Sequence, residues 1–179
     1  MKVPDERLPA ATFEELALPL FDQLYNFARW LTQDTTEAED LVQETYTKAL
    51  RGFSSFQAGT NFRAWMYRIL RNSFLSSKTG LKSTVAFDEE ELEPAPDAST
   101  PETVLIEQAN REMVQQALSE LPGHFREILL LCEVEEMSYQ EIADTLAIPA
   151  GTVMSRLSRA RKALRGVLRE KLQGGQHGV

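Results

Sequence analysis

A concentration of positive charge between residues 152 and 172 is the strongest chemical signal in the sequence. This stretch holds seven lysine and arginine residues and a single acid. At 100° per residue, Ser155, Arg159 and Lys162 share one arc of a helix, and the cations on its flanks are Arg156, Arg161 and Arg165. Cationic side chains on one helical face match phosphates and base edges, so the stretch predicts a contact with nucleic acid.

The residues before and within this stretch predict the element that positions the cations. A first helix over residues 139–146 precedes a break at residues 147–150, because Pro149 disfavours helical geometry for the residue before it. Thr152 is suited to cap a second helix. The apolar stripe of that helix is Val153, Leu157, Ala160 and Leu164. This order is typical of a helix-turn-helix, which reads the DNA major groove. An ordinary helical hairpin with a solvated basic face is the alternative.

A net charge of −8 over the 179-residue chain argues against DNA binding, but this charge is unevenly distributed along the sequence. Residues 81–101 carry one lysine against six acids, whereas residues 1–80 and 102–179 have net charges of only −1 and −2. Local basic patches therefore matter more than the total. The acidic total still argues against indiscriminate coating of DNA, so another protein is expected to deliver this one to its DNA site.

The sequence offers no catalytic constellation. His124 and His177 are the only histidines, Cys132 is the only cysteine, and none has further ligands at metal spacing. No phosphate-binding glycine loop or nucleophile motif occurs. We therefore expect a non-enzymatic protein with no catalytic residues, no metal site and no cofactor.

The amino-acid composition indicates the cellular compartment in which the protein is expected. A hydrophobic content of 42% with 26% charged residues is typical of a globular protein. No apolar run approaches the length of a membrane span, and the first twelve residues lack a secretory hydrophobic segment. The lone cysteine fits a reducing environment. We expect a cytoplasmic protein without membrane insertion.

A capping box formed by Thr12 and Glu15 predicts a helix that extends to about Leu31. Pro19 lies inside this range, so the helix either kinks there or truly begins there. Residues 1–12 are expected to form a flexible N-terminus.

A second helix is predicted from its cap at Asp34 to Gly52. Its buried stripe is Ala38, Leu41, Val42, Thr45 and Ala49. Its opposite face presents Asp40, Gln43, Glu44, Thr47 and Arg51. Most such faces are merely solvated, but a polar, acid-bearing face also suits docking on a large partner. Periodicity alone does not choose between these interpretations.

Aromatic and basic residues are interleaved in the next segment. A polar loop at 53–61 leads to a third helix, which Asn61 is suited to cap. Its predicted inward residues are Phe62, Met66, Ile69 and Ser73, and its predicted outward residues are Tyr67, Arg68, Arg71 and Asn72. Four cations and no acid lie between residues 60 and 80. Rings interleaved with arginines suit single-stranded nucleic acid, although the rings are equally suited to a core.

Two small all-α domains follow from these patterns. Residues 13–80 form the first, and residues 81–101, with six acids and three prolines, are expected to be a flexible acidic linker. A helix start at Thr100 and Pro101 then opens the second domain, residues 102–172. Cys132 falls in an apolar run and is interpreted as a core residue, with redox sensing a minor alternative. Residues 173–179 are expected to be frayed.

Four segments together resemble bacterial RNA polymerase sigma factors of the extracytoplasmic-function (ECF) type, in the sigma-70 family. They are AEDLVQETYTKAL (38–50), NFRAWMYRILRN (61–72), LPGHFREILLL (121–131) and MSYQEIADTLAIPAGTVMSRLSRARKAL (137–164). The resemblance spans about residues 13–170 and implies a minimal two-domain member. It implies a protein that binds core RNA polymerase and directs promoter-specific transcription initiation.

The resemblance assigns a role to each predicted surface. The first domain corresponds to region 2, which docks on the clamp helices of the polymerase β′ subunit and melts the −10 element. The implied core-binding residues are Asp40, Gln43, Glu44 and Thr47. The implied −10 residues are Phe53, Phe56, Asn61, Arg63, Tyr67, Arg68, Arg71 and Asn72. The second domain corresponds to region 4, which contacts the β flap and reads the −35 element. The implied −35 residues are Thr152, Ser155, Arg156, Arg159, Arg161 and Lys162.

The resemblance also implies partners. Members of the family are often held inactive by an anti-sigma factor, so we expect one here, besides core polymerase and promoter DNA. The free protein is expected to be a monomer. Met154 departs from the polar or cationic residue often found at its position, which leaves only apolar contact there. The alternative function is a free-standing helix-turn-helix regulator that binds duplex operator DNA without polymerase.

Overall fold

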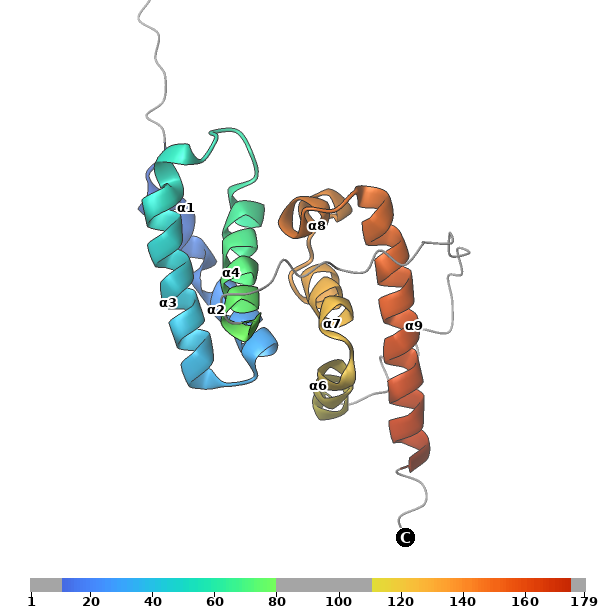
Figure 1. Cartoon of the computed structure of the whole chain (residues 1–179). Coiled ribbons are helices and arrows are strands. Elements are labelled where there is room, and N and C mark those ends of the chain that lie inside the picture. The colour runs from blue at the N-terminus through green and yellow to red at the C-terminus, as the bar shows by residue number, and fades with distance from the viewer. Residues whose placement is uncertain (1–10, 80–110, 175–179) are drawn as a thin grey trace, which may run out of the picture. The chain divides into compact units, whose positions relative to one another are not determined.

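The computed structural model describes residues 11–79 and 111–174, and within these ranges every regular element is helical (Figure 1). The chain divides into two compact units, residues 1–85 and 86–179. The predicted all-α fold with two small helical domains is therefore confirmed. The helix start at Thr100, the linker at 81–101 and most of the predicted N-terminus lie outside the described residues.

The first unit begins with helix α1 (Phe13–Ala17), a 3₁₀ turn (Leu18–Leu20) and helix α2 (Phe21–Thr32). The predicted capping box is present, because the Thr12 hydroxyl accepts the Glu15 N–H and the Glu15 carboxylate accepts the Thr12 N–H. Pro19 lies at the start of the 3₁₀ turn. The single predicted helix is therefore interrupted at the proline and continues as a second helix.

Helices α3 (Thr35–Gly52) and α4 (Phe62–Thr79) complete the first unit, and α2, α3 and α4 pack on one another. Asp34 caps α3 as predicted, since its carboxylate accepts the Glu37 N–H at 2.8 Å. All five residues of the predicted α3 stripe are buried. Asn61 precedes α4, and its side-chain oxygen accepts the Ala64 N–H at 2.9 Å, as expected of a cap.

The predicted outward face of α4 is wrong at two residues. Tyr67 is 0% exposed and Arg71 is 7% exposed. The Tyr67 ring packs against Phe27 of α2, with ring centroids 5.2 Å apart. Both α2 and α3 cover α4, so its buried arc is wider than a single stripe. Ile69, predicted to face inward, is half-buried instead.

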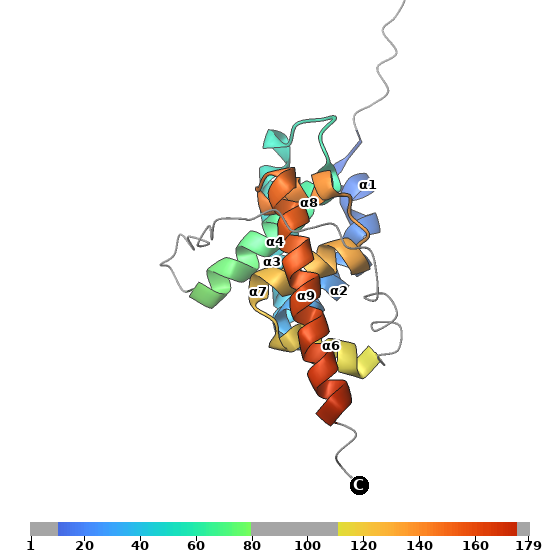
Figure 2. The same ribbon diagram turned by 90° about the vertical axis from the view of Figure 1, so that its right-hand side faces the viewer.

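The second unit contains α6 (Arg111–Glu120), α7 (Gly123–Leu129), a π-helical turn (Leu130–Val134), α8 (Tyr139–Leu146) and α9 (Ala150–Gly174). The long helix α9 contacts α6, α7 and α8 along its length (Figure 2). One continuous apolar stripe of α9 meets all three helices. The helix runs to Gly174, so the first two residues of the predicted frayed tail are helical.

Helices α8 and α9 form the predicted helix-turn-helix, and α8 has the predicted bounds. Ala147 ends α8 in the left-handed region, with φ 55°. Helix α9 begins at Ala150, so Thr152 is not its cap but lies in its first turn. The backbone N–H of Thr152 donates to the Pro149 carbonyl at 3.0 Å. The Val153 N–H donates to the same carbonyl at 3.2 Å, so the helical hydrogen bonds of α9 start at Pro149, earlier than predicted.

Candidate functional site

The outer surface of α9 is a cationic arc over a fully apolar stripe. Every residue of the predicted stripe is buried, and Leu168 extends it by one further turn. On the opposite arc Lys162 is exposed, whereas Ser155 and Arg159 are partly exposed. The predicted amphipathic helix is confirmed, and Arg159 and Lys162 lie opposite its buried stripe.

Arg161 makes an ion pair inside its own unit. Its Nε and Nη2 atoms lie 3.1 and 2.7 Å from Oε1 of Glu133, and Nη2 lies 3.7 Å from Sγ of Cys132. Burial opposes the charge of Arg161, but the hydrogen bond and negative charge of Glu133 outweigh burial and raise its pKa. The implied contact of Arg161 with the −35 element therefore competes with its ion pair to Glu133 in the π-helical turn. Sequence patterns do not predict this pair, because Glu133 lies in the run that was interpreted as buried.

Cys132 is half-buried rather than part of the core. The apolar run that contains Cys132 changes to a π-helical turn at Leu130, in which Leu130 and Leu131 are buried and Glu133 and Val134 are exposed. Burial and the neighbouring Glu133 carboxylate raise the pKa of the Cys132 thiol, and Arg161 offsets only part of this effect. The thiol is therefore protonated at neutral pH, which disfavours the reactive thiolate.

The polar face of α3 is exposed along its whole length. Asp40, Gln43, Glu44 and Thr47 are all exposed, over two helical turns. Glu44 forms an ion pair with Lys48 at 2.5 Å, and the Thr47 hydroxyl donates to the Gln43 carbonyl at 2.9 Å. The four residues implied to bind polymerase thus form one continuous surface.

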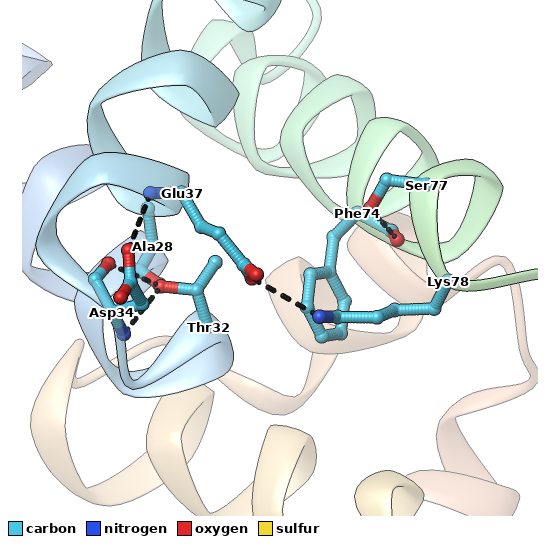
Figure 3. Close-up of polar contacts among 7 residues, drawn as sticks. All are labelled: Ala28, Thr32, Asp34, Glu37, Phe74, Ser77 and Lys78. Atoms are coloured by element: carbon cyan, nitrogen blue, oxygen red, sulfur yellow. Dashed lines mark hydrogen bonds and ion pairs between the residues drawn. The ribbon is translucent and has the colours of Figure 1, made fainter.

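A hollow of about 280 Å³ lies beside this surface, between α3 and the end of α4. Its lining residues are Thr32, Glu37, Asp40, Leu41, Glu44, Phe74, Ser77 and Lys78. Lys78 closes one side by an ion pair with Glu37 at 3.0 Å, and its ammonium group lies 5.7 Å from the centroid of the Phe74 ring (Figure 3). Asp40 and Glu44 therefore border a depression with an apolar wall, a feature that helical periodicity does not predict.

Half-buried rings hold the loop that joins α3 to α4. Phe56 lies 5.2 Å from Phe62 and 5.1 Å from Trp65, measured between ring centroids, and Phe53 stacks on Phe56 at 6.2 Å. Phe13 of α1 contacts both Phe53 and Phe62. The rings are packed on one another and still partly accessible, so they stabilise the loop, and a contact with single-stranded nucleic acid stays a prediction.

Exposed polar groups occur before α4 and along it. Arg68 and Asn72 are exposed one turn apart on α4, and Asn61 is exposed beside its cap contact. Arg63 is half-buried, with its guanidinium 5.6 Å from the centroid of the Tyr67 ring. Of the eight residues implied to hold −10 DNA, only Tyr67 and Arg71 are buried.

The described residues contain no cluster of three metal-binding side chains. Among these residues, no helix combines the length and apolarity of a membrane span.

Comparison with known proteins assigns each unit to a family. Residues 19–83 match sigma-70 region 2, and residues 111–164 match sigma-70 region 4. The two matches define a sigma-70 protein. The ECF RNA polymerase sigma factor SigE of Mycolicibacterium smegmatis is 36% identical over 169 residues, which cover 88% of this chain and 65% of SigE. SigW of Bacillus subtilis is 30% identical over 158 residues, which cover 83% of this chain and 84% of SigW. The chain belongs to the ECF RNA polymerase sigma factors.

A solved structure agrees with this assignment. The sigma factor RpoE of Bartonella quintana, crystallised with the anti-sigma factor NepR, is 29% identical with a TM-score of 0.66. The similarity covers 88% of this chain and 96% of that chain. The resemblance inferred from the four sequence segments is confirmed. The alternative of a free-standing helix-turn-helix regulator is not favoured.

Proposed function

We propose that the two units divide promoter recognition between them while both engage core RNA polymerase. The second unit reads the −35 element with α9. The first unit docks on the polymerase with α3 and holds the melted −10 element with α4 and the preceding loop. The observation that carries this proposal is the outward cationic arc of α9 over a fully buried stripe, in a chain that also contains region 2.

The −35 contact follows from the chemistry of α9. Arg159 and Lys162 lie on its outward arc and are suited to base edges and phosphates. Thr152, Ser155 and Arg156 flank them nearer the start of the helix, where a recognition helix contacts bases. Arg161 contributes least, because Glu133 holds its guanidinium.

The polymerase contact is assigned to Asp40, Gln43, Glu44 and Thr47, which would meet the β′ clamp helices. Their exposure and the neighbouring hollow support this assignment, since an interface needs polar groups beside a depression that receives apolar side chains. The second unit would contact the β flap. With polymerase supplying non-specific affinity, the acidic total charge of the chain is compatible with promoter binding.

The −10 contact is assigned to Asn61, Arg68 and Asn72, with Phe53, Phe56 and Arg63 beside them. Exposed amide and guanidinium groups around partly accessible rings can track a single-stranded backbone and receive extruded bases. Each base that is held offsets a few kcal/mol of unstacking. Tyr67 and Arg71 are left out of this set because the core encloses them.

An anti-sigma factor is a further proposed partner. The complex of the RpoE factor with NepR supports this proposal. Such a partner would compete with core polymerase for the exposed surfaces. The free protein, according to the same proposal, is a cytoplasmic monomer with no catalytic activity.

Transcription in vitro with purified core polymerase and a genomic promoter library tests the whole proposal. We expect initiation at a defined set of promoters, together with weak binding of the free protein to duplex DNA. Tight binding to a palindrome without polymerase, with no promoter-specific initiation in the absence of any anti-sigma factor, would contradict it.

Glu44→Ala tests the polymerase contact. If Glu44 is one of the few interface residues that carry most of the binding energy, its truncation costs more than about 1 kcal/mol, and core affinity should fall at least about fivefold. The ion pair with Lys48 is exposed, so the fold should be little affected. Glu14→Ala, at an exposed acid of α1, is the matched control and should leave core affinity unchanged. Equal affinities for both variants would show that the α3 face is merely solvated.

A further inference from the structure

Met154 is an exposed apolar residue on the recognition helix. It leaves 59% of its surface accessible, more than any other large apolar residue described in the second unit. Its neighbour Val153 is fully buried and belongs to the apolar stripe of α9. Met154 therefore belongs to the surface of α9 and not to its core.

Met154 is also the longest side chain at the leading end of this helix. Residues 150–155 read Ala-Gly-Thr-Val-Met-Ser. A Cβ atom at Gly151 would meet nothing within 4 Å, so the surface there is open. The Ser155 hydroxyl donates to the carbonyls of Gly151 and Thr152, each at 3.2 Å, and so bonds to the backbone of its own helix. Within this opening turn and a half, the side chain with the greatest reach into solvent is apolar.

The chemistry of the methionine thioether limits what this side chain can read. It has no hydrogen-bond donor and only a weak acceptor, but its three rotatable bonds let it adapt to an apolar surface. Among the base edges of the major groove, thymine alone presents a methyl group. The N-terminal residues of a recognition helix contact those edges.

We propose that Met154 recognises the C5-methyl group of a thymine in the −35 element. This inference rests on the proposed function of α9 and names one base among those it reads. Covering one methyl group is worth about fourfold in affinity, so Met154 adds a modest preference to the contacts of the neighbouring cations.

Uracil substitution tests this contact without changing base pairing. Each thymine of a −35 element, on either strand, is replaced singly by deoxyuridine in a promoter that the full-length protein and core polymerase use. With the wild-type protein, one substitution should lower initiation about fourfold. Met154→Ala should lower initiation on the thymine template by a similar factor and should not respond to uracil.

Two further variants complete the test. Met154→Leu keeps an apolar side chain and should retain the uracil effect. Arg169→Ala, at an exposed cation near the far end of α9, should also retain it. The proposal is overturned if no uracil substitution affects the wild-type protein, if Met154→Ala remains sensitive, or if the selected −35 elements contain no A·T pair. Initiation at defined promoters in those same reactions would leave the proposed function intact, whereas its loss on all templates would refute that function instead.

Discussion

Helices α4 and α9 both show a basic pattern in the sequence, but they use their polar residues differently. On α4, Arg71 and Tyr67 are buried and Arg63 lies against the Tyr67 ring. On α9, Arg159 and Lys162 face outward over a narrow apolar stripe. The buried residues of α4, which packs against α2 and α3, include adjacent pairs and so span a wide arc, whereas those of α9 form a single stripe. The width of the buried arc of a helix therefore decides how many of its polar residues remain available to a partner.

The largest expected effect is on the unfolding free energy, and it distinguishes the buried Tyr67 of α4 from its exposed neighbour Arg68. Tyr67→Ala should lower the unfolding free energy of the first unit by about 3–5 kcal/mol, because it removes a fully buried ring. Arg68→Ala should change that free energy by less than about 0.5 kcal/mol but weaken use of the −10 element. Urea unfolding followed by tryptophan emission is specific here, since Trp30 and Trp65 both lie in the first unit. Similar unfolding free energies for the two variants would contradict the assignment of Tyr67 to the core and Arg68 to the surface.

On α9 the corresponding change should affect function and not stability. Arg159→Ala should weaken −35-dependent initiation by about 1–3 kcal/mol, or roughly five- to 150-fold, because a base or phosphate contact is lost. Arg169→Ala removes an exposed cation further along the same helix and is the matched control. Transcription from promoters with intact and mutated −35 elements measures the effect. Unchanged promoter strength in Arg159→Ala would exclude that residue from the reading surface.

Tyr46 is another aromatic residue of the first unit and can be compared with Tyr67. Its hydroxyl donates to the Ala17 carbonyl at 2.6 Å, and Tyr46→Phe should cost about 1 kcal/mol at neutral pH. Burial, aided by the charge of Asp22, raises the pKa of Tyr46 to about 12. The folded state thus retains a proton that the unfolded state loses near pH 10, so this stabilisation is complete below pH 10 and is lost as pH rises toward 12.

The difference in unfolding free energy between wild type and Tyr46→Phe, measured from pH 8 to 12, isolates this group. The difference should shrink above pH 10, because only the wild type has the phenol to ionise. The other three tyrosines are common to both proteins and cancel. A difference that stays constant to pH 12 would show that Tyr46 ionises as an ordinary surface tyrosine.

The smallest effect concerns the ion pair that Arg161 of α9 makes with Glu133 within its own unit. Arg161→Ala and Glu133→Ala should each lower the unfolding free energy of the second unit by about 0.5–1 kcal/mol, since the pair is partly exposed. The double variant should cost little more than either single variant. Circular dichroism follows this unfolding. If Arg161→Ala weakens initiation as much as Arg159→Ala does, Arg161 belongs with the DNA-contacting residues.

Local signals in the sequence predicted much of this fold. The caps at Thr12, Asp34 and Asn61 are present because a short polar side chain satisfies nearby backbone N–H groups wherever the rest of the chain lies. The apolar stripes of α3 and α9 are correct in full, since each helix packs along one face. The polar face of α3 was predicted from the same periodicity.

Features that depend on contacts distant in sequence were not predicted. Tyr67 is buried because Phe27, forty residues earlier, packs against its ring. Arg161 pairs with Glu133 across 28 residues. Phe13 of α1 contacts the ring of Phe53, forty residues later in the sequence. Periodicity places a residue on a face of its own helix, but it does not say how many other helices cover that face.

Glycine in place of Ala147 would make the helix-turn-helix more stable. An alanine with φ 55° pays a steric cost of about 1–2 kcal/mol that glycine avoids, and only part of that difference is offset by the greater freedom of an unfolded glycine. Every alanine codon becomes a glycine codon by a change at its second base. The turn is thus one nucleotide away from a more stable form, and a lineage under heat stress can reach it without altering any residue that faces the promoter.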